Sequence, residues 1–234
     1  MKIIAGNWKM NGSKQALKEM TAELNKIDTD NTIILCVPFT MLGAETGKIN
    51  LGAQDISNHE KGAYTGEISG AMLKEAGAKY VIVGHSERRQ YHNEDNDIVR
   101  QKAEMAIQNG IIPIICVGET MEEKQAGKAM EIIESGVKES VPNNSNGHII
   151  IAYEPRWAIG AGITPTHEEI EQAHSLIAKT LHSLELDETP ILYGASVNGL
   201  NAGDIMSLNN VDGVLVGGAS LKPDDFISII TSIK

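Results

Sequence analysis

Polar residues that directly follow apolar runs carry groups that could perform acid–base chemistry. They are Asn7 and Lys9 after the first run, His85 after the fourth and Glu154 after the sixth. A partly buried carboxylate with a raised pKa can act as a general base, and a histidine whose pKa a helix N-terminus lowers stays neutral. A lysine at a strand end is unusual, and it could help to hold an anion. Each residue also has an ordinary explanation: a solvated lysine, a structural histidine, or a carboxylate paired with an arginine.

Two glycine-containing segments, Gly194-Ala195-Ser196 and Gly217-Gly218, follow the seventh and eighth apolar runs. Bare backbone N–H groups can approach an anion there, and barrels often bind phosphate after their last two strands. One Gly-Gly pair is more often a turn, but two such segments favour a phosphate site. The chain has 20 Lys and Arg against 31 Asp and Glu, a formal charge of −11, so no basic surface attracts nucleic acid or membranes. An anionic substrate must therefore be held locally.

The apolar runs that carry these residues alternate with segments of helical period, as in βα units around a buried parallel sheet. Eight runs are present, centred near Ile3, Ile33, Leu51, Tyr80, Ile111, Ile149, Ile191 and Val214. A spacing of about 29 residues per unit favours an α/β fold, a closed (β/α)8 barrel, formed by residues 1–234 as a single domain. The short segment between Pro38 and Gly52 predicts a shortened second βα unit. All strands end at one mouth in such a barrel, which would bring the polar residues together.

Helical periodicity predicts helices over residues 13–27, 69–76, 94–108, 121–141, 168–184, 201–208 and 224–233. Thr166 and Glu169 form a capping-box pattern at the start of the helix at 168–184. Residues 55–68 lack periodicity, which in a compact domain is typical of a functional or interaction loop. Residues 155–165 combine an apolar centre with glycines. They suit either a mobile lid that excludes water or an ordinary glycine-containing connection.

Both cysteines, Cys36 and Cys116, lie within apolar runs. This placement predicts buried free thiols in a reducing compartment and argues against a zinc site. The N-terminus lacks the basic and apolar regions of a signal peptide, and no apolar stretch approaches the ~18 residues of a membrane span. We therefore expect a cytoplasmic protein without a metal site.

Seven short segments, in order along the chain, carry distinctive polar and glycine-containing motifs. They are residues 7–11 (Asn-Trp-Lys-Met-Asn), 52–54 (Gly-Ala-Gln), 62–68 (Gly-Ala-Tyr-Thr-Gly-Glu-Ile), 84–89 (Gly-His-Ser-Glu-Arg-Arg), 116–119 (Cys-Val-Gly-Glu), 152–160, and 217–221 (Gly-Gly-Ala-Ser-Leu). The whole chain thereby resembles the triosephosphate isomerase family, because chance does not supply seven ordered matches. The resemblance implies interconversion of dihydroxyacetone phosphate and glyceraldehyde 3-phosphate, in glycolysis and gluconeogenesis, by a homodimer without a cofactor.

The resemblance also implies roles for individual residues. Glu154 matches the catalytic base, and His85 matches the neutral electrophile that polarises the carbonyl group. Lys9 matches the cation that stabilises the enediolate, with Asn7 beside it and Glu87 as a supporting partner of the lysine. The residues that match the phosphate-binding backbone amides are Gly160, Ser196, Gly217 and Gly218.

The loop at residues 55–68 matches the one that, in this family, plugs into the neighbouring subunit, with Thr65 at its tip. Three positions depart from the family pattern: Ala195 replaces a second glycine, Arg156 a small apolar hinge residue, and Ala161 a threonine. None of them is among the four matched catalytic residues. They leave the rate of lid opening undetermined, just as the sequence does not distinguish a dimer from a tetramer.

Two other classes of function remain as alternatives. Another phosphate-binding barrel, such as an epimerase or isomerase of a larger sugar phosphate, would share the glycine segments. It is not expected to combine Asn7, Lys9, His85 and Glu154 with a long lid. A barrel kept as an interaction or adhesion module would need no catalytic residues at all. A triose phosphate assay separates the three classes.

Overall fold

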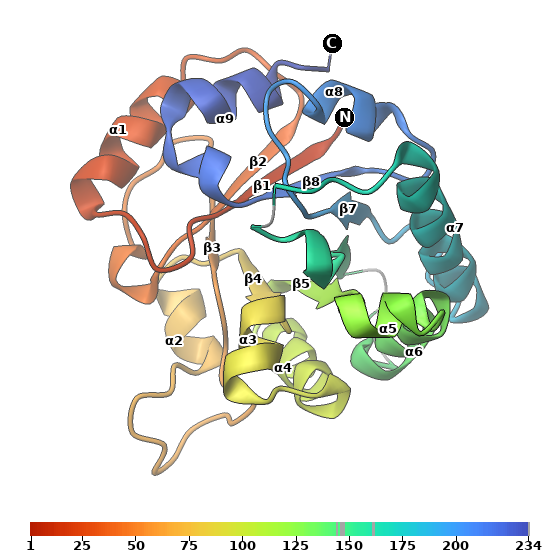
Figure 1. The fold of residues 1–234 in the computed structure, drawn as a ribbon. Helices are drawn as coiled ribbons and strands as arrows, with labels where there is room; N and C mark the ends of the chain where they lie inside the picture. The colour runs from red at the N-terminus through yellow and green to blue at the C-terminus, as the bar shows by residue number, and fades with distance from the viewer. Residues whose placement is uncertain (144, 146–147, 161, 234) are drawn as a thin grey trace.

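Eight parallel strands form a closed barrel in the computed structural model, which describes residues 1–143, 145, 148–160 and 162–233. The strands are β1 (Ile3–Asn7), β2 (Thr32–Cys36), β3 (Asn50–Ala53), β4 (Tyr80–Val83), β5 (Ile112–Val117), β6 (Ile150–Tyr153), β7 (Ile191–Tyr193) and β8 (Gly213–Val216). Each strand pairs with its sequence neighbours, and β1 also pairs with β8 (Figure 1). The predicted (β/α)8 barrel is confirmed.

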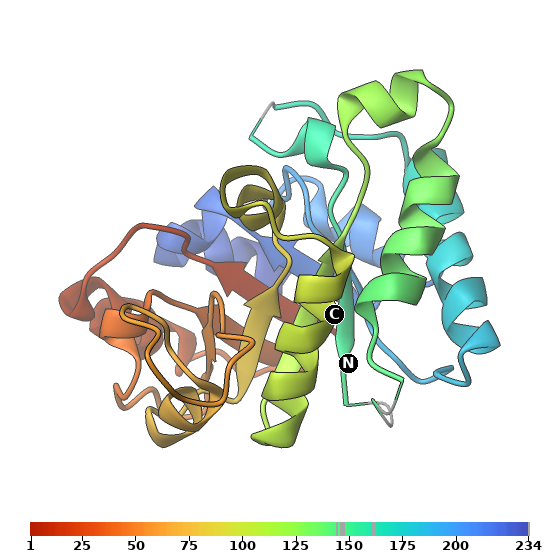
Figure 2. The ribbon, with the colours of Figure 1, turned by 90° about the horizontal axis from the view of Figure 1, so that it is seen from below.

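Helices surround the barrel on its outside (Figures 1 and 2). In the described residues they are α1 (Lys14–Leu24), α2 (Gly70–Glu75), α3 (Ser86–His92), α4 (Asn96–Gln108), α5 (Met121–Gln125), α6 (Ala129–Ser140), α7 (His167–Ser183), α8 (Ala202–Ser207) and α9 (Pro223–Ile230). Short 3-10 helices are η1 (Phe39–Met41), η2 (Arg156–Ala158) and η3 (Gly218–Leu221). Across the described part of the chain, no helix has the length and apolar character to cross a bilayer.

Alternating strand residues separate an inner apolar core from an outer one. The inner core consists of Ala5, Ile34, Cys36, Ile82, Ile114, Cys116, Ile150, Ala152, Leu192 and Leu215. The intervening strand residues face outward and pack with the apolar faces of the helices in a larger cluster. Cys36 and Cys116 are both free and buried, as predicted.

The structure corrects two helix predictions. Residues 121–141, predicted as one helix, form α5 and α6, because Gly127 adopts a left-handed conformation (φ 70°) just after α5 ends. The helical turn predicted to open at His85 is the seven-residue helix α3, which the predicted helix ranges did not include and which ends at Asn93 in a left-handed conformation (φ 56°). The second βα unit is shortened as predicted, with only the short 3-10 helix η1 between β2 and β3.

Capping side chains determine where several helices begin. These helix starts can therefore be predicted from the sequence. The side chains of Ser13, Ser69 and Asp95 each accept a hydrogen bond from the backbone N–H three residues later. Thr166 and Glu169 form the predicted capping box, with hydrogen bonds of 3.2 and 2.9 Å between side chains and backbone.

Residues 55–68 extend away from the barrel between β3 and α2, in the orange segment at the lower left of Figure 1. The rings of His59 and Tyr64 stack within this loop, with centroids 3.8 Å apart and planes 5° from parallel. Thr65, at the next position, is exposed. The loop therefore has internal order and an exposed tip.

Candidate active site

A cavity of about 230 Å³ opens at the carboxyl ends of the strands. It is lined by every residue that the sequence assigned to catalysis or phosphate binding: Asn7, Lys9, His85, Glu154, Gly160, Ser196, Gly217 and Gly218. Strand alternation explains part of this convergence, because Ala5 and Ala152 lie in the inner core and Asn7 and Glu154 follow two residues later. Among the described residues, no three His, Cys, Asp or Glu side chains gather as a metal ion requires.

Lys9 enters the cavity from an unusual backbone position. Its φ of 52° lies in the left-handed region, and its N–H donates to Asn7 Oδ1 at 3.0 Å. The Lys9 ammonium donates to Glu87 Oε1 at 2.6 Å, so Glu87 is its partner, as predicted, although Glu87 does not line the cavity. Trp8 is buried, and its indole N–H donates to the Ser220 carbonyl at 2.9 Å. This anchors the segment between the two polar residues.

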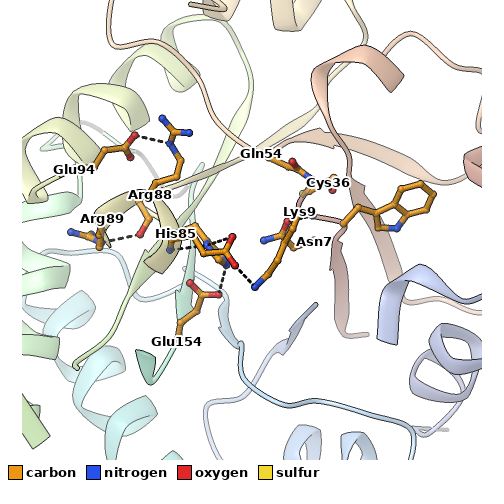
Figure 3. A network of polar contacts seen from close by, with 12 residues as sticks. Asn7, Lys9, Cys36, Gln54, His85, Arg88, Arg89, Glu94 and Glu154 are labelled. Carbon is orange, nitrogen blue, oxygen red and sulfur yellow. Dashed lines mark hydrogen bonds and ion pairs between the residues drawn. The ribbon is translucent and has the colours of Figure 1, made fainter. Parts of the chain in front are cut away.

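His85 caps the N-terminus of α3, and contacts on both ring nitrogens orient it. The backbone N–H of Glu87 donates to Nδ1 at 3.2 Å, so the neutral ring carries its proton on Nε2. Nε2 lies 3.3 Å from Glu154 Oε1, and both side chains are 5% exposed. Figure 3 shows the Glu154 carboxylate below the His85 ring, with the Lys9 side chain reaching toward the same region from the right. A buried donor therefore faces a buried carboxylate.

The contact between His85 and Glu154 controls the pKa of both groups. Burial lowers the pKa of His85, but the Glu154 carboxylate raises it above the ordinary histidine value. Burial raises the pKa of Glu154, but His85, the Cys116 thiol and Lys9 bring it below the ordinary glutamate value. The two sequence-based expectations, a lowered histidine pKa and a raised carboxyl pKa, are wrong because they omit this pair. Glu154 is therefore ionised at neutral pH, as a base must be.

Two glycines leave the space that Glu154 occupies, and neither was a predicted site residue. A Cβ on Gly118, whose φ is 157°, would lie 1.9 Å from the Glu154 carbonyl oxygen. A Cβ on Gly194 would lie 3.0 Å from the Glu154 Cγ. Within the described residues, Glu154 Oε2 is buried without a hydrogen-bond partner, so no protein donor competes for it. Both glycines lie in segments that were identified as motifs from the sequence. Their position in those motifs is the signal that could have identified them as site residues.

The predicted phosphate-binding positions present accessible backbone to the cavity. A Cβ added at Gly160 or Gly218 would meet no atom within 4 Å among the contacts described, so a ligand can approach there. Ser196 has a left-handed backbone (φ 47°), and its hydroxyl donates to the Ala158 carbonyl at 3.0 Å. Ala195 is not among the described residues with positive φ, so its backbone does not require the glycine usual in the family.

The segment predicted as a lid, residues 155–165, contains η2, which begins directly after Pro155. The Trp157 indole N–H donates to Glu119 Oε1 at 2.7 Å, and the Lys124 ammonium lies 3.5 Å from the centroid of the Trp157 ring. These two contacts are long-range and have no sequence signal. Ala161, one of the departures from the family pattern, lies outside the described residues.

Thr65 does not line the cavity of its own chain, because it lies on the exposed loop of residues 55–68. A separate cavity of about 320 Å³ lies beside Lys9 and His85. Its lining includes Met10 and Tyr91, whose side chains are among the exposed large apolar groups. The structure thus places a protruding loop and an apolar hollow on one chain.

Comparisons with known proteins agree with this geometry. A family model described as triosephosphate isomerase matches residues 2–233. A triosephosphate isomerase from Albidiferax ferrireducens is 46% identical, over 99% of this chain and 98% of that protein. One from Vesicomyosocius okutanii is 42% identical over 97% of each chain. The crystal structure of triosephosphate isomerase from Bartonella henselae has a TM-score of 0.89 at 40% identity, covering 99% of this chain and 98% of that one.

Proposed function

Since this chain belongs to the triosephosphate isomerase family, which interconverts dihydroxyacetone phosphate and glyceraldehyde 3-phosphate, we propose that Asn7, Lys9, His85 and Glu154 carry out this reaction. The observation that carries the assignment is the convergence of a carboxylate, an imidazole and an ammonium group on one cavity. The reaction needs a base for a carbon-bound proton, a donor to the substrate oxygens and a positive charge near the enediolate. These residues supply all three.

In the proposed mechanism, Glu154 takes a proton from the substrate carbon next to the carbonyl group. The electron pair of that C–H bond forms the enediolate, and Glu154 returns the proton to the neighbouring carbon. His85 donates a hydrogen bond from Nε2 to the substrate oxygens, because the Glu87 N–H occupies Nδ1. It also helps to move the hydroxyl proton from one substrate oxygen to the other. Lys9 stabilises the negative charge, and Asn7 holds the Lys9 backbone through the 3.0 Å hydrogen bond.

We assign phosphate binding to the backbone N–H groups of Gly160, Ser196, Gly217 and Gly218. Their shared cavity and the open space at the glycines support this assignment. A Cβ on Gly217 would lie 3.8 Å from the Lys9 Cε, so this segment runs alongside the proposed catalytic lysine. We assign the mobile lid to residues 155–165, which follow the base and reach the phosphate site at Gly160. Closure of this lid would exclude water from the enediolate.

A cofactor-free assay tests the reaction against its alternatives. The purified protein, treated with EDTA, is expected to interconvert the two triose phosphates in both directions, because the chain supplies the base, the donor and the cation. An epimerase or isomerase of larger sugars would turn over pentose or hexose phosphates instead, and an interaction module would turn over neither. Activity that disappears with EDTA and returns with a divalent metal would contradict the assignment of no cofactor.

We further propose that the enzyme is a homodimer in which the loop of residues 55–68 enters the partner's hollow beside Lys9. The exposed tip at Thr65 and the 320 Å³ cavity with Met10 and Tyr91 in its lining support this arrangement. Exposed apolar side chains beside a catalytic site are typical of a surface that another chain covers. Each active site would then depend on contacts from the neighbouring subunit.

Thr65→Arg is expected to convert the dimer into monomers and to lower kcat steeply. The long charged side chain would be buried at the interface without a partner, which costs about 3–5 kcal/mol. Lys9 and His85 would lose the chain that holds them, whereas helical content should be preserved. Sedimentation velocity, circular dichroism and kcat measure these effects, with Thr65→Ser as the control that keeps the hydroxyl. A variant that stays dimeric, or a fully active monomer at nanomolar concentration, would contradict this role of the loop.

We also propose that residues 1–234 are one domain in the cytoplasm. The pairing of β1 with β8 supports a single domain, because the first and last strands belong to the same closed sheet. The buried free thiols of Cys36 and Cys116 suit a reducing compartment, in which thiols persist without pairing.

A further inference from the structure

A second cavity of about 230 Å³ lies beside the strand ends that carry Glu154. Its lining includes Arg89 from α3, Gly118 after β5, and Arg156 from η2. None of the proposed catalytic or phosphate-binding residues lines it. Gly118 lines this cavity and also lies against the Glu154 carbonyl oxygen. The cavity is therefore next to the active site but outside it.

Arg89 brings a partly buried positive charge to this cavity and forms no direct ion pair with the described residues. Its guanidinium donates to the Gly84 carbonyl at 2.8 Å, to Asn96 Oδ1 at 2.7 Å, to the Cys116 carbonyl at 3.1 Å and to Ser140 Oγ at 3.4 Å, all of which are neutral acceptors. No carboxylate oxygen of the described residues lies within 4.0 Å of a guanidinium nitrogen of Arg89, the distance that defines an ion pair. Burial is the main cause that lowers the pKa of Arg89, and the nearby Arg156 charge lowers it further, whereas Cys116, Glu94 and Glu154 raise it in part. An anion in the cavity would offset both effects.

Arg156 adds a second positive charge at the same cavity. Its backbone N–H donates to the Glu119 carbonyl at 2.9 Å, whereas its side chain makes no hydrogen bond or ion pair with any residue that the structure describes. It is also one of the three positions at which this sequence departs from the family pattern. The guanidinium is therefore available to a ligand.

Two carboxylates in the cavity lining are already engaged as helix caps. Asp95 Oδ1 accepts from the Ile98 N–H at 2.9 Å, at the start of α4. Glu123 Oε2 accepts from the Thr120 N–H at 2.8 Å, in the capping box of α5. Both carboxylates keep their negative charge, but neither forms an ion pair with Arg89 or Arg156, so neither occupies a guanidinium group that an anion would need.

We propose that this cavity binds a small tetrahedral oxyanion, a phosphate group, between Arg89 and Arg156. The Arg156 guanidinium presents free planar pairs of N–H donors that match phosphate oxygens. Arg89, with four of its five N–H donors already engaged, adds its positive charge and its remaining N–H. The cavity volume far exceeds the ~30 Å³ that one water takes up in the liquid, so an ion of this size fits. The bound anion would also tie Arg156, at the start of residues 155–165, to α3. Only this last consequence depends on the proposed lid.

Calorimetric titration with inorganic phosphate tests the site, with the active site first saturated by a phosphorylated carboxylate that mimics the enediolate. Wild-type protein is expected to bind one additional phosphate per chain. Arg156→Ala should weaken this binding about tenfold or more, since one charge-assisted contact is lost, and Arg156→Lys should recover part of it. Arg100→Ala is the matched control, because it removes the same charge from α4, where Arg100 pairs with Asp97 and Glu104.

The same titration with glycerol phosphate tests whether the cavity prefers a phosphate monoester or the free phosphate ion. The compound that binds more tightly represents the preferred ligand. The proposal is overturned if no phosphate binds once the active site is filled, or if Arg100→Ala weakens binding as much as Arg156→Ala. Turnover in the cofactor-free assay is measured separately. Failure of the proposed function would therefore be distinguishable from failure of this second site.

Discussion

Replacement of Lys9 by methionine is expected to abolish useful turnover, with kcat lower by about a thousandfold or more. The lysine brings a positive charge to the cavity of a chain whose formal charge is −11, and the enediolate is anionic. Methionine keeps the length and apolar stem of the side chain but has no charge. It also leaves Glu87 without its partner at 2.6 Å, which adds negative potential beside the intermediate.

The Lys9→Met effect is measured as kcat and as the affinity of an enediolate-mimicking inhibitor, which should weaken in parallel. Lys14→Met is the matched control, because Lys14 is exposed at the start of α1 and outside the cavity. It removes the same charge and should leave kcat unchanged. Unaltered inhibitor affinity in Lys9→Met would refute the assignment of this lysine to the transition state.

Glu154→Asp is expected to lower kcat by about a hundredfold or more while substrate phosphate binding stays nearly unchanged. Loss of one methylene retracts the carboxylate by about 1 Å, and a displacement of that size can cost about a hundredfold in rate. The strand end cannot readily shift to compensate, because Gly118 and Gly194 pack against the Glu154 backbone and Cγ. The carboxylate would also withdraw from His85 Nε2, which now lies 3.3 Å away.

Steady-state kinetics separate the two effects, because kcat should fall while KM changes little. Glu131→Asp, on the exposed face of α6, makes the same chemical change away from the site and should be silent. If Glu154→Asp retained more than half of the wild-type kcat, Glu154 would not be the base.

Much of the fold could be predicted because its determinants are local. Apolar runs mark the strands, and capping residues such as Ser13 and Thr166 mark helix starts, since each acts within a few residues of itself. The division of residues 121–141 into α5 and α6 was not predicted. An apolar period can continue through a break, and the left-handed conformation of Gly127 became evident only in the folded chain.

The candidate site could be predicted as a set of residues but not as an interacting pair. Asn7 and Glu154 follow strand residues that face the barrel interior, so closing the barrel brings them to one cavity. The pKa directions of His85 and Glu154 were predicted wrongly, because each group was considered with its own strand and helix. Their 3.3 Å contact joins the end of β6 to the start of α3, and there the nearby charges and the hydrogen bond together outweigh burial.

The sequence by itself determined which residues end the strands and where glycine-containing segments follow β7 and β8. Its net charge also determined that the chain has no general attraction for anions. Only the tertiary structure decided what those residues meet. Gly118 against Glu154, Trp157 against Glu119, and two arginines at one cavity are contacts between separate segments. The physical reason is range: propensity and alternation act over a few residues, whereas packing and electrostatics depend on distances that exist only after the barrel has closed.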